Sequence, residues 1–185
     1  RDIVDIADVL PFDSVYKKYV VRQKAQEGSP YIYTNRFIPM NEQLGYVVGF
    51  FIGDGNYDNT FHTIMFTQKS REVLDILASY IWNCFAVGSY IREDNTGGGG
   101  IKYIMKVNSE TVHDFFKYYL HIKDKAQHKN IPTNILQFKK EFTKGIIAGI
   151  IDSDGTIQEE GFINIRLSSR EAITQLTLLF KYFGY

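Results

Sequence analysis

Two Asp-Gly pairs lie one hundred residues apart in this chain, and each follows a run of apolar residues. The first run ends at Asp54 and Gly55, and the second ends at Asp154 and Gly155. Each run predicts a helix, since glycine directly after the last residue is typical of a helix C-terminus. The two carboxylates are therefore expected at the negative ends of two helix dipoles, where an anion is disfavoured and a cation is favoured.

Small residues recur at four-residue spacing in both runs, so they form one stripe along each helix. The stripes consist of Gly45, Gly49 and Gly53, and of Gly145, Gly149 and Ser153. Because such residues let two backbones approach closely, we expect the helices to pack together and bring Asp54 and Asp154 side by side. Paired carboxylates suit Mg²⁺, which binds oxygen ligands and commonly takes one or two carboxylates plus phosphate. This outlines a metal-assisted site for phosphodiester hydrolysis.

Other interpretations of the two runs have to be weighed. Glycines at this spacing occur in membrane helix pairs, but a membrane span needs about 20 apolar residues and these runs are near ten. A calcium loop starting at Asp54 would need glycine at Asn59 and glutamate at Met65. For either copy alone, a simple turn after a buried helix remains open.

Composition favours a folded protein in a reducing compartment. The 185 residues are 44% hydrophobic and 15% aromatic, which is typical of a compact globule. A single cysteine, Cys84, excludes an internal disulfide framework. We expect no membrane association and an intracellular location, cytoplasmic or nuclear. The net charge is zero, but lysines are concentrated in residues 111–145, as in a local binding surface or a solvated helix face.

The repeat extends beyond the two apolar runs. Residues 41–138 predict the order helix, two strands, helix, two strands, helix. The triplet that opens at Ser70 returns at Ser169, ninety-nine residues later, and each copy precedes an apolar helix pattern. We therefore expect an N-terminal extension of unknown role (1–40), a first unit (41–138) and a second unit (139–185), related by a pseudo-twofold axis.

Alternation in the predicted strands separates a buried face from an exposed polar face. In residues 162–167, Ile163 and Ile165 share the expected buried face, and ninety-nine residues earlier the same positions are Ile64 and Phe66. The opposite face suits a DNA groove, where phosphate contacts position a protein and base contacts specify sequence. The DNA-binding candidates are Thr63, Thr67, Lys69, Tyr90, Arg92, Lys102, Lys106, Asn164 and Arg166.

Residues 47–55 (VVGFFIGDG) and 147–155 (IAGIIDSDG) both resemble the nine-residue signature of LAGLIDADG homing endonucleases. The segment Lys129-Asn-Ile-Pro132 is similar to a block that precedes the second signature in endonucleases carried by inteins. The resemblance covers roughly residues 41–185. It implies an α+β fold of two αββαββα halves, with a β-saddle over DNA. The second half is expected to be incomplete in this chain.

The resemblance also implies an activity and assigns residues to it. It implies a site-specific, Mg²⁺- or Mn²⁺-dependent endonuclease that cuts double-stranded DNA at a long asymmetric site, the complete protein being a monomeric pseudo-dimer. Asp54 and Asp154 match the catalytic aspartates, with Gly53 and Ser153 beside them at the metal. Lys129 matches a basic residue that polarises the attacking water or stabilises developing charge. Otherwise Lys129 is an exposed lysine before a proline turn.

The family also contains proteins that do not cut DNA. An RNA maturase or a non-catalytic DNA-binding protein of the same fold is therefore the alternative expectation for this chain.

Overall fold

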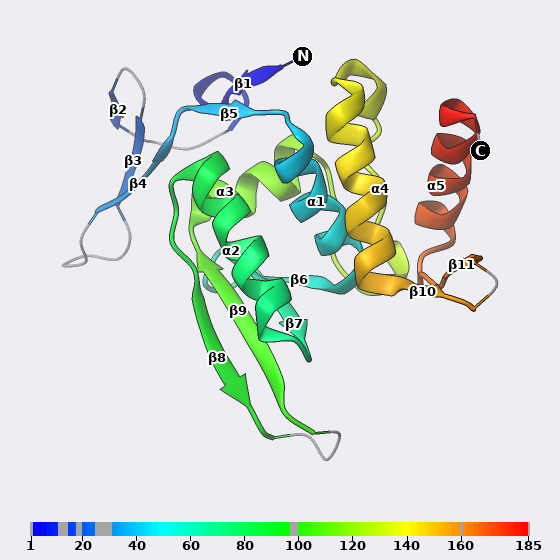
Figure 1. The fold of residues 1–185 in the computed structure, drawn as a ribbon. Coiled ribbons are helices and arrows are strands. Elements are labelled where there is room, and N and C mark those ends of the chain that lie inside the picture. Colours follow the sequence, from blue (N-terminus) through cyan, green and yellow to red (C-terminus); the bar gives the residue numbers. More distant parts are fainter. Residues whose placement is uncertain are drawn as a thin grey trace.

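Two helices lie side by side at the centre of the molecule (Figure 1). They are α1 (Glu42–Asp54) and α4 (Lys140–Asp154). The computed structural model describes residues 2–10, 15–17, 20–24, 31–96, 100–159 and 161–184. Asn41 caps the N-terminus of α1: its side-chain oxygen accepts a hydrogen bond from the backbone N–H of Leu44 at 2.9 Å. Such a cap satisfies an N–H that lacks a partner inside the helix.

The glycine stripes form the contact between α1 and α4. A Cβ atom added at Gly45 would collide with the backbone carbonyl of Phe142, and one added at Gly145 would collide with that of Glu42. The next glycine of each stripe faces the opposite backbone in the same way. These contacts are reciprocal between residues one hundred positions apart, as a pseudo-twofold axis requires. The predicted helix pairing is confirmed.

The first unit has the predicted αββαββα order. After α1 come β6 (Gly55–Asp58), β7 (Thr63–Gln68), α2 (Arg71–Phe85), β8 (Tyr90–Asp94), β9 (Lys102–Asn108), α3 (Glu110–Asp114) and a π-helical turn (Phe115–Tyr119). The strands form one antiparallel sheet in the order β6-β7-β9-β8. Figure 1 shows the β8–β9 hairpin extending beyond the helices.

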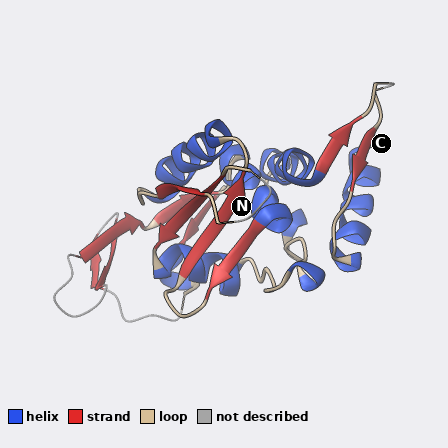
Figure 2. Ribbon diagram, turned by 90° about the horizontal axis from the view of Figure 1, so that it is seen from below, coloured by secondary structure: helices blue, strands red, loops and turns tan. Residues whose placement is uncertain are grey.

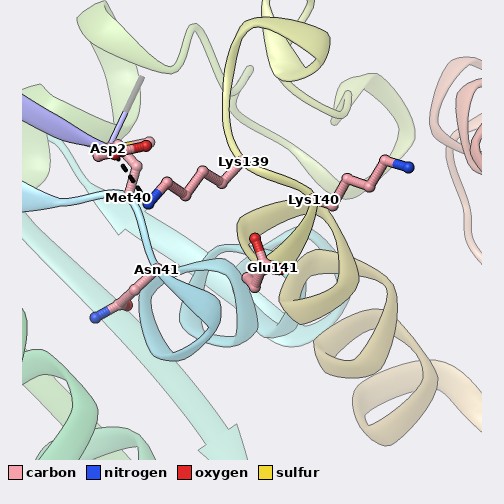
Figure 3. A pocket seen from close by; sticks show the side chains of 6 residues that line it. All are labelled: Asp2, Met40, Asn41, Lys139, Lys140 and Glu141. Atoms are coloured by element: carbon pink, nitrogen blue, oxygen red, sulfur yellow. Dashed lines mark ion pairs between the residues drawn. The ribbon is translucent and has the colours of Figure 1, made fainter.

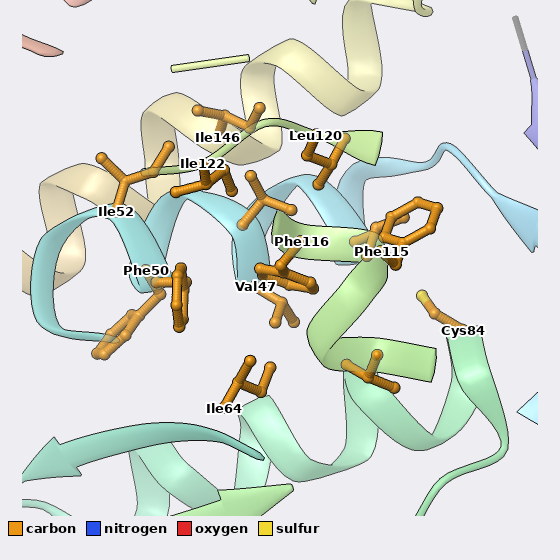
Figure 4. Packing of buried hydrophobic residues seen from close by; sticks show 14 of the residues in the cluster. Val47, Phe50, Ile52, Ile64, Cys84, Phe115, Phe116, Leu120, Ile122 and Ile146 are labelled. Atoms are coloured by element: carbon orange, nitrogen blue, oxygen red, sulfur yellow. The ribbon is translucent and has the colours of Figure 1, made fainter. Parts of the chain in front are cut away.

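One face of this sheet packs against the helices and forms the core (Figure 4). Aromatic rings dominate it: the ring of Phe51 lies 5.8 Å from that of Phe66 and 5.1 Å from that of Phe116, edge to face in both cases. Such pairs add to the free energy gained by burying their area. Cys84 is fully buried here, and burial raises the pKa of its thiol to about 12. It is a core residue.

The second unit has fewer elements. It consists of α4, the hairpin of β10 (Gly155–Ile157) and β11 (Ile163–Ile165), and α5 (Arg170–Phe183). Ile163 is 50% exposed, so the prediction that its strand face is buried is wrong at this position. Its counterpart Ile64 is covered because it pairs with Val107 of β9 and α3 packs on β7. No described element of the second unit does the same for Ile163.

The N-terminal region attaches to the first unit. It consists of β1 (Ile3–Asp5), a 3-10 turn (Ile6–Asp8), β2 (Val15–Lys17), β3 (Val20–Lys24), β4 (Tyr31–Asn35) and β5 (Phe37–Pro39). Strand β1 pairs with β5, and β2-β3-β4 form a separate sheet. The side chains of Thr34 and Asn35 donate to the carbonyls of Phe85 and Cys84, at the end of α2. Figure 2 shows this sheet and the β10–β11 hairpin at opposite ends of the molecule.

Two 3-10 turns, Ala126–His128 and Ile135–Gln137, lie between the π-helical turn and α4. Among the described residues, no helix combines the length and apolar character that crossing a membrane requires.

Candidate active site

The structure brings Asp54 and Asp154 together at the C-terminal ends of α1 and α4. Gly53 lies against the side chains of Ser153 and Asp154, so a Cβ atom added there would collide with both. The charge of Asp154 acts on Asp54 strongly enough to raise the pKa of Asp54. The proximity predicted from the two stripes is therefore confirmed. It arises because the glycines hold the backbones close along the whole contact.

The surroundings of both carboxyl groups disfavour their charged forms. Burial, followed by the charge of Asp154, raises the pKa of Asp54 to about 6, although Lys129 and Gln68 act in the opposite direction. Burial also raises the pKa of Asp154. Two partly buried carboxylates at two negative helix ends would be stabilised by a divalent cation. Their oxygen donors fit Mg²⁺ or Mn²⁺.

Gly53 and Ser153, the other residues expected at the metal, lie beside the carboxylates but already have partners. The hydroxyl of Ser153 donates to the carbonyl of Ile150 at 3.1 Å and lies 3.4 Å from Oδ2 of Asp154. The carbonyl of Gly53 lies 3.3 Å from Nζ of Lys129. A metal-binding role for either residue stays a prediction.

Lys129 is buried against the end of α1. Its side chain donates to the carbonyl oxygens of Phe51 at 2.7 Å, of Gly53 at 3.3 Å and of Gly55. Since only 4% of the residue is exposed, the interpretation as an exposed lysine is wrong. Burial lowers the pKa of Lys129 to about 8, while the charge of Asp54 opposes this shift. The ammonium group thus caps α1 and places a positive charge beside both aspartates.

The loop that carries Lys129 is held by the second unit. The hydroxyl of Ser169 donates to the carbonyl of Lys129 at 2.5 Å. The side-chain oxygen of Gln175, on α5, accepts from the backbone N–H of Ile131 at 2.7 Å. Lys129 therefore connects α1 of the first unit to α5 of the second, and the site is built by both.

The sequence analysis missed Gln68. This side chain, at the end of β7, donates a hydrogen bond to Oδ2 of Asp54. Gln68 has the same strand parity as the buried residues Ile64 and Phe66, so its amide points to the helix side of the sheet. A polar residue on a buried face, close to the helix end, was the signal that could have found it.

The predicted polar strand face exists in the first unit. Lys106 pairs with Met65 and Tyr90, while Ile104 pairs with Thr67 and Arg92. Directly paired residues of antiparallel strands project to the same side, and here it is the side away from α1, α2 and α3. We call this exposed side of the sheet the saddle face. The residues on it that were predicted to bind DNA are Thr67, Tyr90, Arg92, Lys102 and Lys106.

Thr63 is an exception, and its prediction as an exposed DNA contact is wrong. It is 1% exposed, and its hydroxyl lies 3.1 Å from the carbonyl oxygen of Phe61 and 3.0 Å from Oδ1 of Asn108, either of which can accept its hydrogen. The turn before β7 and the end of β9 cover it. Lys69 is exposed just after β7, and Asn164 and Arg166 are exposed on or directly after β11.

A cavity of about 630 Å³ lies at the other end of the central helices (Figure 3). It is lined by Asp2, Met40, Asn41, Lys139, Lys140 and Glu141. The ammonium of Lys139 pairs with Asp2 at 2.8 Å there. Because these residues precede or begin α1 and α4, the cavity is remote from the aspartates that end the same helices.

Divalent-cation affinity at Asp54 and Asp154 is expected to fall as the pH falls through about 6, because protons then compete for Asp54. The pKa of Asp54 is raised from 3.8, so in the metal-free protein the folded state retains this proton at pH values where the unfolded chain has lost it. Rising pH between these values therefore reduces the stability of the metal-free fold. Calorimetric titration with Mn²⁺ at about pH 5 and about pH 7.5 measures the expected fall in cation affinity. Equal affinities would contradict it.

Comparison with known proteins supports the fold. The family model described as "LAGLIDADG-like domain" matches residues 41–119. The structure resembles full-length DUF199/WhiA from Thermatoga maritima, with a TM-score of 0.55 and 13% identity over 78% of this chain and 45% of that one. It also resembles the N-terminal LAGLIDADG domain of DUF199/WhiA, with a TM-score of 0.54 and 14% identity over 78% of this chain and 66% of that one.

Two curated relatives are much longer than this chain. It is 27% identical, over 143 residues, to an A-type ATP synthase subunit of Methanopyrus kandleri, covering 77% of this chain and 13% of the relative. It is 26% identical, over 182 residues, to a DNA-directed RNA polymerase subunit, Rpo1C, of Methanocaldococcus jannaschii, covering 93% of this chain and 20% of the relative. The matched part is thus a minor segment of each.

Proposed function

From a LAGLIDADG-like fold that joins two aspartates at its centre, we propose that this protein is a site-specific, metal-dependent endonuclease that cuts double-stranded DNA. The observation that carries the proposal is the pair Asp54 and Asp154, held together by reciprocal glycine contacts. If each Asp-Gly pair were only a turn after a buried helix, nothing would require the two carboxylates to lie side by side. Their mutual repulsion lowers the stability of the metal-free protein, as expected for a site built for a cation.

Each residue near the pair has a chemical role in this proposal. Asp54 and Asp154 hold Mg²⁺ or Mn²⁺, which would lower the pKa of bound water and stabilise negative charge on the phosphate oxygens. Gln68 fixes the orientation of Asp54 through its hydrogen bond. Lys129 holds the end of α1 in place and adds a positive charge that offsets charge developing on the phosphate.

The saddle face supplies the DNA contacts. Lys102, Lys106 and Arg92 contact phosphates or guanine edges, and Thr67 and Tyr90 contact neighbouring bases or sugars. Asn164 and Arg166 occupy the corresponding positions of the second unit, ninety-nine residues after Met65 and Thr67. The face runs along the strands, so an extended duplex fits it and the proposed target is long. The target would be asymmetric because the two units carry different residues at corresponding positions.

The substitutions Arg92→Ala and Lys106→Ala are each expected to weaken duplex binding by about 3- to 10-fold and to reduce the salt dependence of binding by about one counterion, because each removes one phosphate contact. Fluorescence anisotropy over a salt series measures both quantities. Lys140→Ala is the control, since Lys140 lies at the other end of α4. Equal losses in all three variants would count against the saddle face as the binding surface.

We further propose that this chain originates from a mobile element, of the kind carried by inteins. An ATP synthase subunit and an RNA polymerase subunit have unrelated activities, yet each contains a segment similar to this chain. That shared segment is more simply explained by an element inserted into both than by the activity of either. A homing endonuclease is such an element, because it cuts the site into which its own coding sequence is copied.

A non-catalytic DNA-binding protein is the second candidate, and the surroundings of Lys129 favour it. All three hydrogens of its ammonium face backbone carbonyls, so none is directed to a water or phosphate. A lysine held in this way serves the fold whether or not catalysis occurs.

Cleavage of a randomised duplex library separates the two candidates. The protein is incubated with the library and Mg²⁺ or Mn²⁺, and the new DNA ends are captured and sequenced. Ends that converge on one long sequence, and that disappear with a chelator, support the endonuclease. Enrichment of a bound sequence without new ends supports the DNA-binding protein. Preferential binding of structured RNA, without cleavage, would contradict both.

A further inference from the structure

A second group of metal-ligating side chains lies where the β6–β7 turn meets α3, outside the candidate active site. It consists of His62, His113 and Asp114, each of which offers one ligand atom within 4.8 Å of the others. His113 is 1% exposed and Asp114 is 5% exposed, whereas His62 is exposed. Two candidate ligands are thus buried, and the third lies near them at the surface.

Hydrogen bonds fix the ring of His113. Its Nδ1 lies 2.8 Å from Oδ1 of Asp114, and its Nε2 lies 3.3 Å from Oδ1 of Asn59. The rings of Tyr57 and His62 each lie edge to face with it, with centroids 5.2 Å away. If Nε2 donates its hydrogen to the amide oxygen of Asn59, Nδ1 is the metal-binding atom and lies beside Oδ1 of Asp114. An outer hydrogen bond of this kind is the common arrangement around metal-binding histidines, because it fixes the ring orientation.

We propose that His62, His113 and Asp114 bind a divalent cation of the zinc type. Two imidazoles and a carboxylate are softer ligands than the all-oxygen pair Asp54 and Asp154, so the two sites prefer different metals. Ligands on one Zn²⁺ lie roughly 3.3 Å apart, given bonds of about 2.0 Å in a tetrahedral site. The exposed His62, whose ligand atom lies within 4.8 Å of the other two, therefore needs to move inward by at most about 1.5 Å. The buried pair, 2.8 Å apart, needs to separate by about 0.5 Å.

The charged groups named around this cluster are negative on balance. Lys117 donates to Oδ1 of Asn59 at 2.6 Å and brings a positive charge close to the cluster. Asp124 accepts from Nδ2 of the same asparagine at 3.0 Å, and Asp114 belongs to the cluster itself. Two carboxylates against one ammonium leave a net negative surrounding, which favours a cation.

The bound ion would fasten the β6–β7 turn to α3. His62 lies in the turn and His113 lies in α3, fifty-one positions apart in the sequence. Since the ligands come together only in the folded chain, binding stabilises the fold. This site is independent of the proposed endonuclease activity.

Titration of the whole chain with Zn²⁺ tests the proposal. We expect binding of one ion per chain, and at a free Zn²⁺ concentration of about 100 times the dissociation constant, a rise in Tm of roughly 5 to 10 °C. Co²⁺ bound in place of Zn²⁺ should give the visible absorption of a tetrahedral site. His62→Gln, a change at an exposed side chain, should weaken Zn²⁺ binding at least about 10-fold without unfolding the protein.

Two control variants separate this site from the rest of the chain. His128→Gln alters a histidine outside the cluster, and Asp154→Asn alters the candidate active site; both should bind Zn²⁺ as the unchanged protein does. The absence of any Zn²⁺-dependent rise in Tm would overturn the proposal. So would full affinity in His62→Gln, or loss of Zn²⁺ binding in Asp154→Asn.

Discussion

Asp154→Asn is expected to reduce DNA cleavage by at least about 10³-fold while duplex affinity, measured without metal, changes by less than about threefold. The substitution removes one of two carboxylates that hold the cation but leaves the saddle face unchanged. Asp54→Asn should have an effect of the same size. Single-turnover cleavage of the selected target measures the cleavage rate of each variant, and fluorescence anisotropy with the same duplex measures its affinity.

Asp152→Asn provides a matched control for this prediction. Asp152 lies two positions before Asp154 on the same helix, and its carboxylate accepts a hydrogen bond from the hydroxyl of Tyr46 at 2.9 Å. The corresponding residue of α1 is Ile52, so this position does not supply a pair of carboxylates as positions 54 and 154 do. Cleavage should be nearly unchanged in Asp152→Asn. Equal losses at positions 152 and 154, or survival of cleavage in Asp154→Asn, would remove the basis for the proposed roles.

Gly149→Ala is expected to lower the free energy of unfolding by about 3 kcal/mol, although alanine is the better helix former by about 1 kcal/mol. The added methyl group would collide with the backbone carbonyl of Tyr46, and a backbone cannot rotate away as a side chain can. The two central helices must therefore separate. Urea denaturation followed by circular dichroism measures the change, and the cation affinity of the aspartate pair should fall with it.

Gly88→Ala is the control for this substitution. No atom lies within 4 Å of a Cβ atom added at Gly88, which follows α2. The stability of Gly88→Ala should lie within about 0.5 kcal/mol of the original. If Gly149→Ala is as stable as Gly88→Ala, the close contact of α1 with α4 does not limit stability.

Much of the fold could be predicted because the repeat supplies each argument twice. The small-residue stripes predicted which faces of α1 and α4 meet, since a close contact between two backbones leaves room only for very small side chains. The helix ends followed from the glycines, but for a different physical reason: Gly55 is extended, and it is required because the ring of Phe51 occupies the space of a side chain. The alternation of apolar and polar residues predicted the saddle face, because successive side chains of a strand point to opposite faces of the sheet.

The failures at the site concern contacts between distant residues. Alternation places Thr63 on the exposed face, but it cannot reveal that the preceding turn and Asn108 cover that end of the strand. The proximity of Gln68 to Asp54 depends on how far β7 runs beside α1. The burial of Lys129 depends on three carbonyls more than seventy positions away. No local pattern contains this information.

The position of Lys129 has a consequence for the time at which the site forms during synthesis. Its ammonium caps the end of α1, yet its own carbonyl is held by Ser169 and its loop by Gln175. A ribosome that has released only the first unit has therefore made Asp54 without the contacts that fix the lysine beside it. Lys129 can take its place beside the two aspartates only after α5 has emerged. The proposed site is therefore complete only when both units have folded.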